Sequence, residues 1–170
     1  MRAFFGLLVV GMAAGLNGLV FADTPKDDAS FAEQMKKCEV CKVLADKPEL
    51  MEHMTWETHK IENGMLCVAS VPKDQKKDFE AAHKQMMQSI AKVTADQKAG
   101  KKVQLCAMCA GMGDLMKAGA KQQQINTATG AISLVTSSDP AVVEKIHAQA
   151  DKAIAEHKKM EQHNQVSAVR

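Results

Sequence analysis

The sequence predicts a two-layer α+β domain in which helices cover an antiparallel sheet of about four strands. Three observations predict this class: an internal repeat with pseudo-two-fold character, a β-hairpin signal in each copy, and a helix with a regular apolar stripe after each hairpin. Each copy is expected to fold as helix, β-hairpin and helix. Because isolated hairpins are marginally stable, we expect the two hairpins to pair into one sheet.

The internal repeat is visible at four matched landmarks. CEVC at Cys38 matches CAMC at Cys106, and ELM at Glu49 matches DLM at Asp114. A turn glycine and a helical histidine follow in each copy: Gly64 and Gly130, His83 and His147. The offsets between matched residues lie between 64 and 68, so the register drifts by only a few loop residues. The repeats are predicted to span about 30–98 and about 101–155.

Each copy carries a hairpin signal. Asn63-Gly64 lies between TWETHKI and MLCVASV, and both residues tolerate the positive φ that a two-residue hairpin turn requires. The matching segment QQQINTATGAISLVTS is a weaker version with a longer turn. These segments predict the four strands of the sheet.

A helix is predicted after each hairpin, because apolar residues recur there at helical spacing. These residues are Phe79, Ala82, Met86, Ile90 and Val93 in the first copy, and Val143, Ile146, Ala150 and Ile154 in the second. Asp139 is the expected N-cap of the second helix, with Pro140 in its first turn. The polar tail, residues 156–170, loses this spacing and is expected to fray.

The first residues predict export. Residues 1–22 combine Arg2, a long apolar stretch and Val20-Phe21-Ala22, which fits the small-x-small rule for cleavage of a secretory signal. Cleavage leaves residues 23–170, with a single α+β domain predicted over 23–155. No cysteine follows the cut to carry a lipid, and no later stretch is apolar enough to span a membrane. The mature protein is therefore expected to be periplasmic or secreted.

The charge balance argues against two classes of partner. The whole chain has a formal charge of +2, and loss of Arg2 with the signal leaves the mature protein nearly neutral. Positive and negative residues are interleaved along the chain. Nucleic acid and anionic membranes are therefore not expected as partners.

Four of the five cysteines form two C-x-x-C motifs at matching places in the repeats: Cys38 with Cys41 (the first motif) and Cys106 with Cys109 (the second motif). Both motifs lie in helix-compatible sequence, where a spacing of three places both sulfurs on one helical face. Thiolates select soft or borderline ions such as Cu(I) or Zn(II). Two motifs that meet near a pseudo-two-fold axis would complete a tetrahedral shell of four thiolates.

Two other chemistries use the same cysteines. Exported thiols are normally oxidised, so the motifs could form structural disulfides in an interaction domain that binds another envelope protein. A disulfide between two mid-helix cysteines of one motif would be strained, whereas one between the motifs would not. Thiol-disulfide redox activity is the third possibility and would need a cysteine at a helix N-terminus. Covalent haem attachment is excluded because Lys42 and Ala110, and not histidine, follow the motifs.

Methionines extend the sulfur-rich face of the second motif. Met108, Met112 and Met116 recur every four residues beside Cys109. Thioethers are good Cu(I) ligands, so Met108 and Met112 are candidate supporting ligands. The alternative is that methionine fills an irregular core in a chain with few aromatic residues.

The string CAMCAGM, from Cys106 to Met112, resembles the Cys-x-Met-Cys-x-Met element of copper-chaperone lipoproteins that serve nitrous-oxide reductase, with one residue inserted. The lipid-attachment cysteine of those proteins has no counterpart here. The resemblance covers seven positions and points to copper as the ion.

Three further residues have simpler expected roles. Cys67 corresponds to Ser133 in the other copy and is expected to be a small buried residue or a free thiol. His83 and His147 occupy matching places within apolar stripes, where neutral imidazoles need only a hydrogen-bond partner.

The expected function is an exported soluble protein that binds Cu(I) or Zn(II) for storage, sensing or transfer. The candidate ligands are Cys38, Cys41, Cys106 and Cys109, with Met108 and Met112 in support. The sequence has no nucleophile elbow, phosphate-binding glycine loop or HExxH motif, which favours binding over catalysis and leaves an enzyme as an open alternative.

Overall fold

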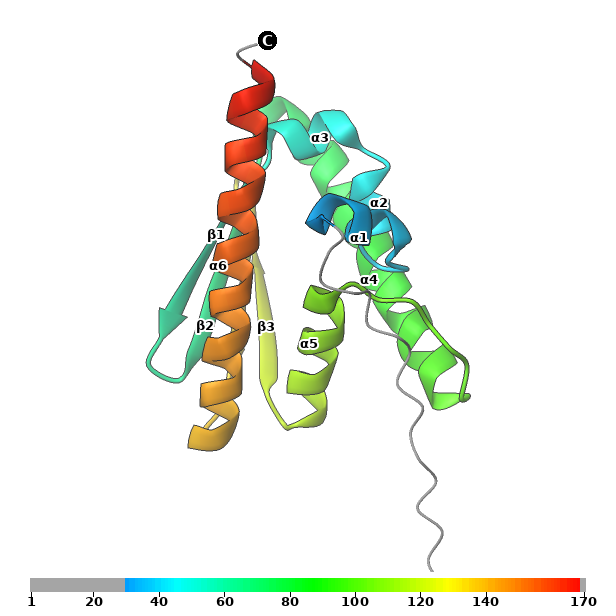
Figure 1. Cartoon of the computed structure of the whole chain (residues 1–170), viewed down its shortest axis with the longest axis vertical. Helices are drawn as coiled ribbons and strands as arrows, with labels where there is room; N and C mark the ends of the chain where they lie inside the picture. The colour runs from blue at the N-terminus through cyan, green and yellow to red at the C-terminus, as the bar shows by residue number, and fades with distance from the viewer. Residues whose placement is uncertain (1–29, 169–170) are drawn as a thin grey trace, which may run out of the picture.

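The computed structural model describes residues 30–168, and their side chains as far as residue 160. This part of the chain contains six α-helices and one four-stranded antiparallel sheet with the helices packed on it (Figure 1), which confirms the predicted α+β class. The elements in chain order are α1 Phe31–Lys37, α2 Lys42–Ala45, α3 Pro48–His53, β1 Thr55–Ile61, β2 Gly64–Ser70, a 3-10 turn Lys73–Gln75, α4 Lys76–Lys98, α5 Ala107–Lys117, β3 Lys121–Asn126, β4 Gly130–Thr136 and α6 Pro140–Ala168. The predicted signal, residues 1–22, lies outside the described residues.

The two hairpins form the sheet by pairing through their second strands. The strand order is β1-β2-β4-β3, with every neighbouring pair antiparallel. The four strands coincide with the four segments that the sequence predicts. Asp139 also caps α6 as expected, because the Ala141 N–H donates to its Oδ1 at 2.9 Å.

The turn of the first hairpin differs from its prediction. Ile61 pairs with Gly64, so the two loop residues are Glu62 and Asn63. No described residue other than glycine has a positive φ, so the expectation of a positive φ at Asn63 is wrong. Gly64 serves another purpose: a Cβ there would overlap the carbonyl oxygen of Val135 on β4. The glycine is needed for the close approach of two strands and not for its dihedral freedom.

The central pairing has an approximate two-fold axis. Cys67 of β2 pairs with Ser133 of β4, its own counterpart in the repeat. Hydrogen bonds at the two ends of this pairing match in the same way: Val71 N–H to Thr129 O at 2.8 Å, and Ser137 N–H to Asn63 O at 3.0 Å. Gly130 likewise approaches the carbonyl oxygen of Ala69 as Gly64 approaches that of Val135. A pseudo-two-fold axis therefore passes between β2 and β4.

The two long helices lie on the same side of the sheet. Helix α6 packs along β1 and β2, where His147 Nε2 lies 2.9 Å from the Ile61 carbonyl oxygen. Helix α4 reaches the opposite edge, where His83 contacts Gln124 of β3. Each helix thus covers the hairpin of the other repeat. Met65 and Val135, cross-strand partners on the covered side, are 2% and 0% exposed.

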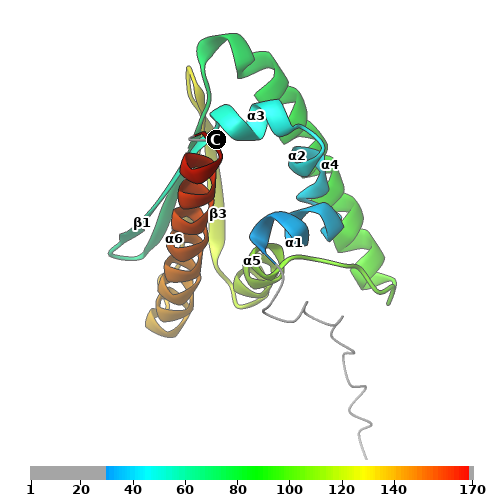
Figure 2. The same ribbon diagram turned by 45° about the horizontal axis from the view of Figure 1, so that its top comes forward.

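The short helices fill the space between the sheet and α4. Figure 2 shows α4 leaning away from the sheet, with α1, α2 and α5 between them. Helix α2 packs on α4, and α5 packs on α6. This arrangement brings α1, α2 and α5, which carry the cysteine motifs, to the inner side of the fold.

Helix α6 continues to Ala168, over most of the segment that was expected to fray. Contacts at its exposed end account for part of this continuation. The rings of His157 and Trp56 lie 5.3 Å apart, and Lys159 forms an ion pair with Glu156 one turn away. Within the described residues, no helix is both long and apolar enough to cross a membrane.

Candidate metal centre

The first motif is a turn that joins two short helices. Cys38 ends α1 with extended dihedrals, φ −80° and ψ 126°, and Cys41 is the residue before α2. The Cys41 N–H donates to Cys38 Sγ at 3.5 Å, and the Lys42 N–H donates to the Cys38 carbonyl oxygen at 3.0 Å. The turn therefore holds the first sulfur in the place of an N-capping side chain.

The second motif repeats this turn at the start of α5. Cys106 is the N-cap, with φ −71° and ψ 163°, and its Sγ accepts the Cys109 N–H at 3.5 Å. The Ala110 N–H donates to the Cys106 carbonyl oxygen at 2.9 Å. The prediction that both motifs lie within helices is wrong: the first cysteine of each precedes a helix. Its sulfur can accept a backbone N–H there, since the first N–H groups of a helix lack backbone partners.

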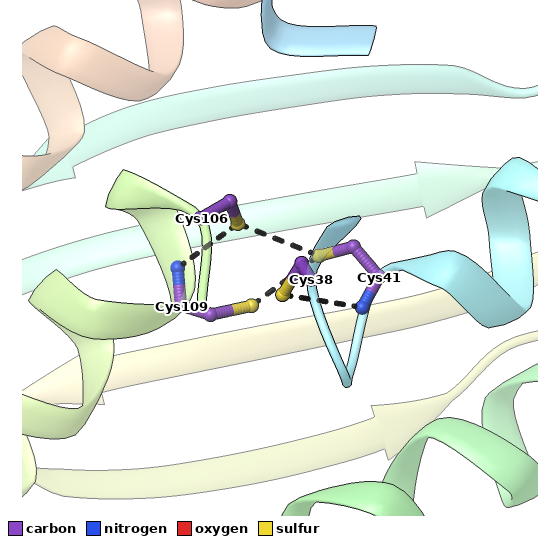
Figure 3. Close-up of side chains that lie close together, drawn as sticks. All are labelled: Cys38, Cys41, Cys106 and Cys109. Carbon is purple, nitrogen blue, oxygen red and sulfur yellow. Dashed lines mark hydrogen bonds between the residues drawn. The ribbon is translucent and has the colours of Figure 1, made fainter. Parts of the chain in front are cut away.

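The fold brings the two motifs together on the inner side of the sheet (Figure 3). All four sulfurs lie within 4.8 Å of one another. Cys41 Sγ is 3.3 Å from Cys109 Sγ and 3.7 Å from Cys106 Sγ. The gathering of four sulfurs at one centre is the arrangement that the matched motifs predict.

Two hydrogen bonds tie the motif loops to each other. The Glu39 N–H donates to the Gln104 carbonyl oxygen at 3.0 Å. At the matching place, the Ala107 N–H donates to Gln34 Oε1 at 3.5 Å. The sequence did not lead us to Gln34. The one feature that could have pointed to a role for Gln34 at this site is its position on α1, one helical turn before Cys38.

The centre is closed off by apolar side chains. Cys38 and Cys106 are fully buried, Cys41 is 8% exposed, and Cys109 is partly exposed. The buried apolar residues of the same core cluster are Met35, Val40, Leu44, Leu50, Val71, Phe79, Ala82, Val93 and Ala131. Three buried cysteines and one partly exposed cysteine among apolar side chains suit a largely enclosed metal site of the kind found in structural tetrathiolate centres.

The sulfur spacing fits a metal ion better than a disulfide. A tetrahedral ion with bonds of about 2.3 Å to sulfur needs sulfurs roughly 3.8 Å apart, whereas a disulfide needs about 2.05 Å. Cys41 Sγ lies 3.3 Å from Cys109 Sγ and 3.7 Å from Cys106 Sγ, and both distances are closer to the spacing around a metal ion than to the length of a disulfide bond. All five cysteines, each within the described residues, are free thiols in this structure.

Hydrogen bonds among the sulfurs divide the thiols into two kinds. Hydrogen bonds from Cys106, Cys109 and Cys41 hold the pKa of Cys38 far below its ordinary value, and the one from Cys109 lowers the pKa of Cys106. Hydrogen bonds with Cys106 raise the pKa of both Cys41 and Cys109, and burial raises them further. The first cysteine of each motif, the one that accepts a backbone N–H, is thus the one with the lowered pKa.

The two candidate methionines lie in different surroundings. The sulfur of Met108 is 3.5 Å from Gln149 Nε2, which also donates to the Met108 carbonyl oxygen at 3.3 Å. Met112 packs on a second core cluster between the sheet, α5 and α6, with Met65 and Leu115. Ligation by either thioether stays a prediction.

The remaining candidates lie outside the four-sulfur group. Cys67 is partly buried against the second core cluster, and burial raises the pKa of its thiol. Thr58 Oγ1 donates to its sulfur at 3.9 Å. His83 stacks on Phe79 with ring centroids 6.1 Å apart, and His147 contacts the Ile61 carbonyl oxygen, so both histidines have the hydrogen-bond partners that were expected.

A charged cleft of about 340 Å³ opens beside the motif loops. It is lined by Glu39, Lys42, Ser89, Lys92, Val93, Asp96, Lys102, Val103 and Gln104. Lys42 pairs with Glu39 at 2.7 Å and Lys92 pairs with Asp96 at 2.8 Å. These two pairs neutralise four of the five charges that line the cleft, and the fifth is that of Lys102.

Comparison with known proteins adds no further assignment: no family model, no curated protein and no solved structure matches this chain. The class of site is therefore defined by geometry alone. It is a group of four cysteine sulfurs, two from each repeat, that could hold one metal ion.

Proposed function

We propose that this chain is an exported protein that binds one soft or borderline metal ion, Cu(I) or Zn(II), through Cys38, Cys41, Cys106 and Cys109. One observation carries the proposal. The four sulfurs lie within 4.8 Å of one another, although the two motifs that supply them are 68 residues apart in the chain. Thiolates are the preferred protein ligands of both ions. Storage, sensing or transfer of the ion are the roles that suit a site without a catalytic motif.

The test is the metal content of the purified mature protein. The chain is expressed with its own leader in an exporting host, and cleavage is checked by the N-terminal sequence, which is expected to begin at Asp23. We expect one ion per chain by inductively coupled plasma mass spectrometry and four thiols protected from alkylation. Cys38→Ser and Cys106→Ser are expected to weaken binding by more than about 100-fold, since each removes a ligand and not merely an outer contact.

Cys67→Ser is the matched control, because Cys67 lies on the sheet and outside the four-sulfur group. It is expected to bind the ion as the wild type does. Absence of metal, with one free thiol after denaturation, would instead support the disulfide-stapled interaction domain that binds another envelope protein.

Isosteric methionine variants separate the two ions. Met108→Leu and Met112→Leu keep the side-chain volume and remove the thioether, a ligand that favours Cu(I) over Zn(II). If the methionines support a copper site, these variants weaken Cu(I) binding and leave Zn(II) binding unchanged. Equal affinities in wild type and both variants would leave the four cysteines as the whole ligand set.

A further inference from the structure

The four sulfurs of the centre are not equivalent. Cys38 Sγ and Cys106 Sγ are fully buried, and each accepts the backbone N–H of the second cysteine of its motif at 3.5 Å. Within the described structure, no backbone N–H donates to the sulfur of Cys41 or Cys109. The second cysteines are therefore less restrained than the first ones.

Cys109 is the cysteine of the centre that we expect a reagent from solution to meet first. It is the one cysteine of the centre that is partly exposed, whereas the other three are buried. The sulfur of Cys41 lies 3.3 Å from it, and Figure 3 shows the two side chains pointing toward each other from different motifs. A small movement of two side chains would bring these sulfurs to the roughly 2 Å of a disulfide bond.

We propose that the centre, when it holds Zn(II), releases this ion as a low-molecular-weight disulfide oxidises Cys109 and Cys41 to one disulfide that joins the two motifs. The proposal rests on the metal-binding function proposed above. The two cysteines that react, Cys41 and Cys109, come from different motifs and not from the same C-x-x-C motif.

The reaction proceeds in two exchange steps. The Cys109 sulfur, which is a thiolate while it holds the ion, attacks one sulfur of the small disulfide, forms a mixed disulfide, and expels the other half as a thiolate that takes up a proton from solvent. The Cys41 thiolate then attacks Cys109 Sγ, forms the protein disulfide, and expels the second half as a thiol. Two electrons pass from the protein sulfurs to the reagent, and the ion keeps its oxidation state.

Loss of the ion follows from the ligand count. The disulfide removes two of the four thiolates, and Cys38 and Cys106 alone cannot complete the tetrahedral shell that Zn(II) requires. The two remaining sulfurs keep their N–H hydrogen bonds, so the turns at the starts of α2 and α5 need not unfold.

The experiment treats the mature protein, loaded with Zn(II), with oxidised glutathione and follows release of the ion with a chromogenic zinc indicator. The sample is quenched in acid, digested with pepsin, and mapped by mass spectrometry for disulfide-linked peptides. We expect one Cys41–Cys109 disulfide for each ion released. A disulfide within either motif, or release of the ion without any protein disulfide, would overturn the proposal.

Metal-free protein provides a test that does not depend on metal binding. Wild-type apoprotein, in which Cys109 first loses its proton to solvent, is expected to form the same Cys41–Cys109 disulfide. Cys41→Ser is expected to stop at a glutathione adduct on Cys109. Cys109→Ser is expected to react at least ~10-fold more slowly, since the reagent meets only buried sulfurs, and Cys67→Ser is expected to react as the wild type. Failure of the chain to bind any ion would refute the proposed function, whereas a wrong disulfide in the apoprotein would refute this inference alone.

Discussion

At the scale of single residues, some of the described glycines are required by close packing, some by a positive φ, and one by neither. Gly64 and Gly130 allow β2 and β4 to approach, because a Cβ at either would overlap a backbone carbonyl oxygen of the other strand. Gly100 and Gly119 adopt positive φ values, 74° and 94°. Gly113 in α5 does not have a positive φ, and no neighbouring atom lies within 4 Å of the position of a Cβ. Nothing in the structure therefore requires glycine there.

Alanine at these positions gives a residue-scale prediction. Gly64→Ala and Gly130→Ala are each expected to lower the free energy of unfolding by roughly 1–3 kcal/mol or more. The two effects are expected to be similar, because in each variant the new Cβ overlaps a backbone carbonyl oxygen of the opposite strand. Gly113→Ala is expected to raise it by roughly 0.5–1 kcal/mol through helix propensity. Urea unfolding of the three variants measures these changes. A tolerated alanine at Gly64 would contradict the close approach of the central strands.

The sequence motifs predicted which four cysteines lie together but not the local structure around them. The matched motifs are sufficient to single out Cys38, Cys41, Cys106 and Cys109 as one group. Helical spacing alone could not show that the first cysteine of each motif stands before a helix and accepts an N–H through its sulfur. That outcome depends on a competition between helix continuation and capping, which is decided by tertiary contacts such as Glu39 N–H to Gln104 O.

At the scale of elements, the end of α4 is tied to the loop that leads to the second motif. Asp96 lies 2.8 Å from Nζ of both Lys92 and Lys101, and its carbonyl oxygen accepts the Lys101 N–H at 3.0 Å. The hydrogen bonds from Lys101 and Lys92 lower the pKa of the Asp96 carboxyl to about 2. The carboxylate thus fixes where the chain leaves α4 on its way to Cys106.

The pH dependence of stability tests this link. A carboxyl with a lowered pKa in the folded protein contributes stability above its ordinary pKa of 3.8, and the contribution is lost as pH falls toward 2. Asp96→Asn lacks that contribution. We expect the wild type to have the higher thermal midpoint at pH 6 and the difference to shrink between pH 4 and pH 2. A difference that does not change over this range would show that the ion pairs contribute nothing to folding.

The long elements were predictable from sequence and the short ones were not. Hairpin turn signals predicted the strands, and apolar residues at helical spacing predicted α4 and α6. The helix expected at the start of the first copy is instead three helices, α1 to α3, of seven, four and six residues. Helices this short are stabilised by packing against other elements and not by their own propensity, so local patterns carry little information about them.

At the scale of the whole molecule, the four-sulfur centre joins the two repeats at a second place. The sheet joins them through β2 and β4, and the centre joins the α1–α2 turn of the first repeat to α5 of the second. The repeat pattern predicted both junctions, because an approximate two-fold axis that pairs matching strands also brings matching motifs together. The distances between the sulfurs depend on packing of the whole inner layer and could not be predicted from spacing.

If the centre shared by both repeats holds an ion as proposed, the stability of the fold depends on that ion. An ion that binds only the folded chain stabilises it by about 4 kcal/mol when its concentration is 1,000 times Kd, which raises the midpoint of a domain of this size by roughly 10–20 °C. Scanning calorimetry with and without Zn(II) is expected to show this increase in the wild type and in Cys67→Ser. The double variant Cys38→Ser/Cys106→Ser keeps one cysteine in each motif and is expected to lose the increase. If the double variant is stabilised as much as the wild type, the ion binds elsewhere, and the four sulfurs serve the fold as buried thiols.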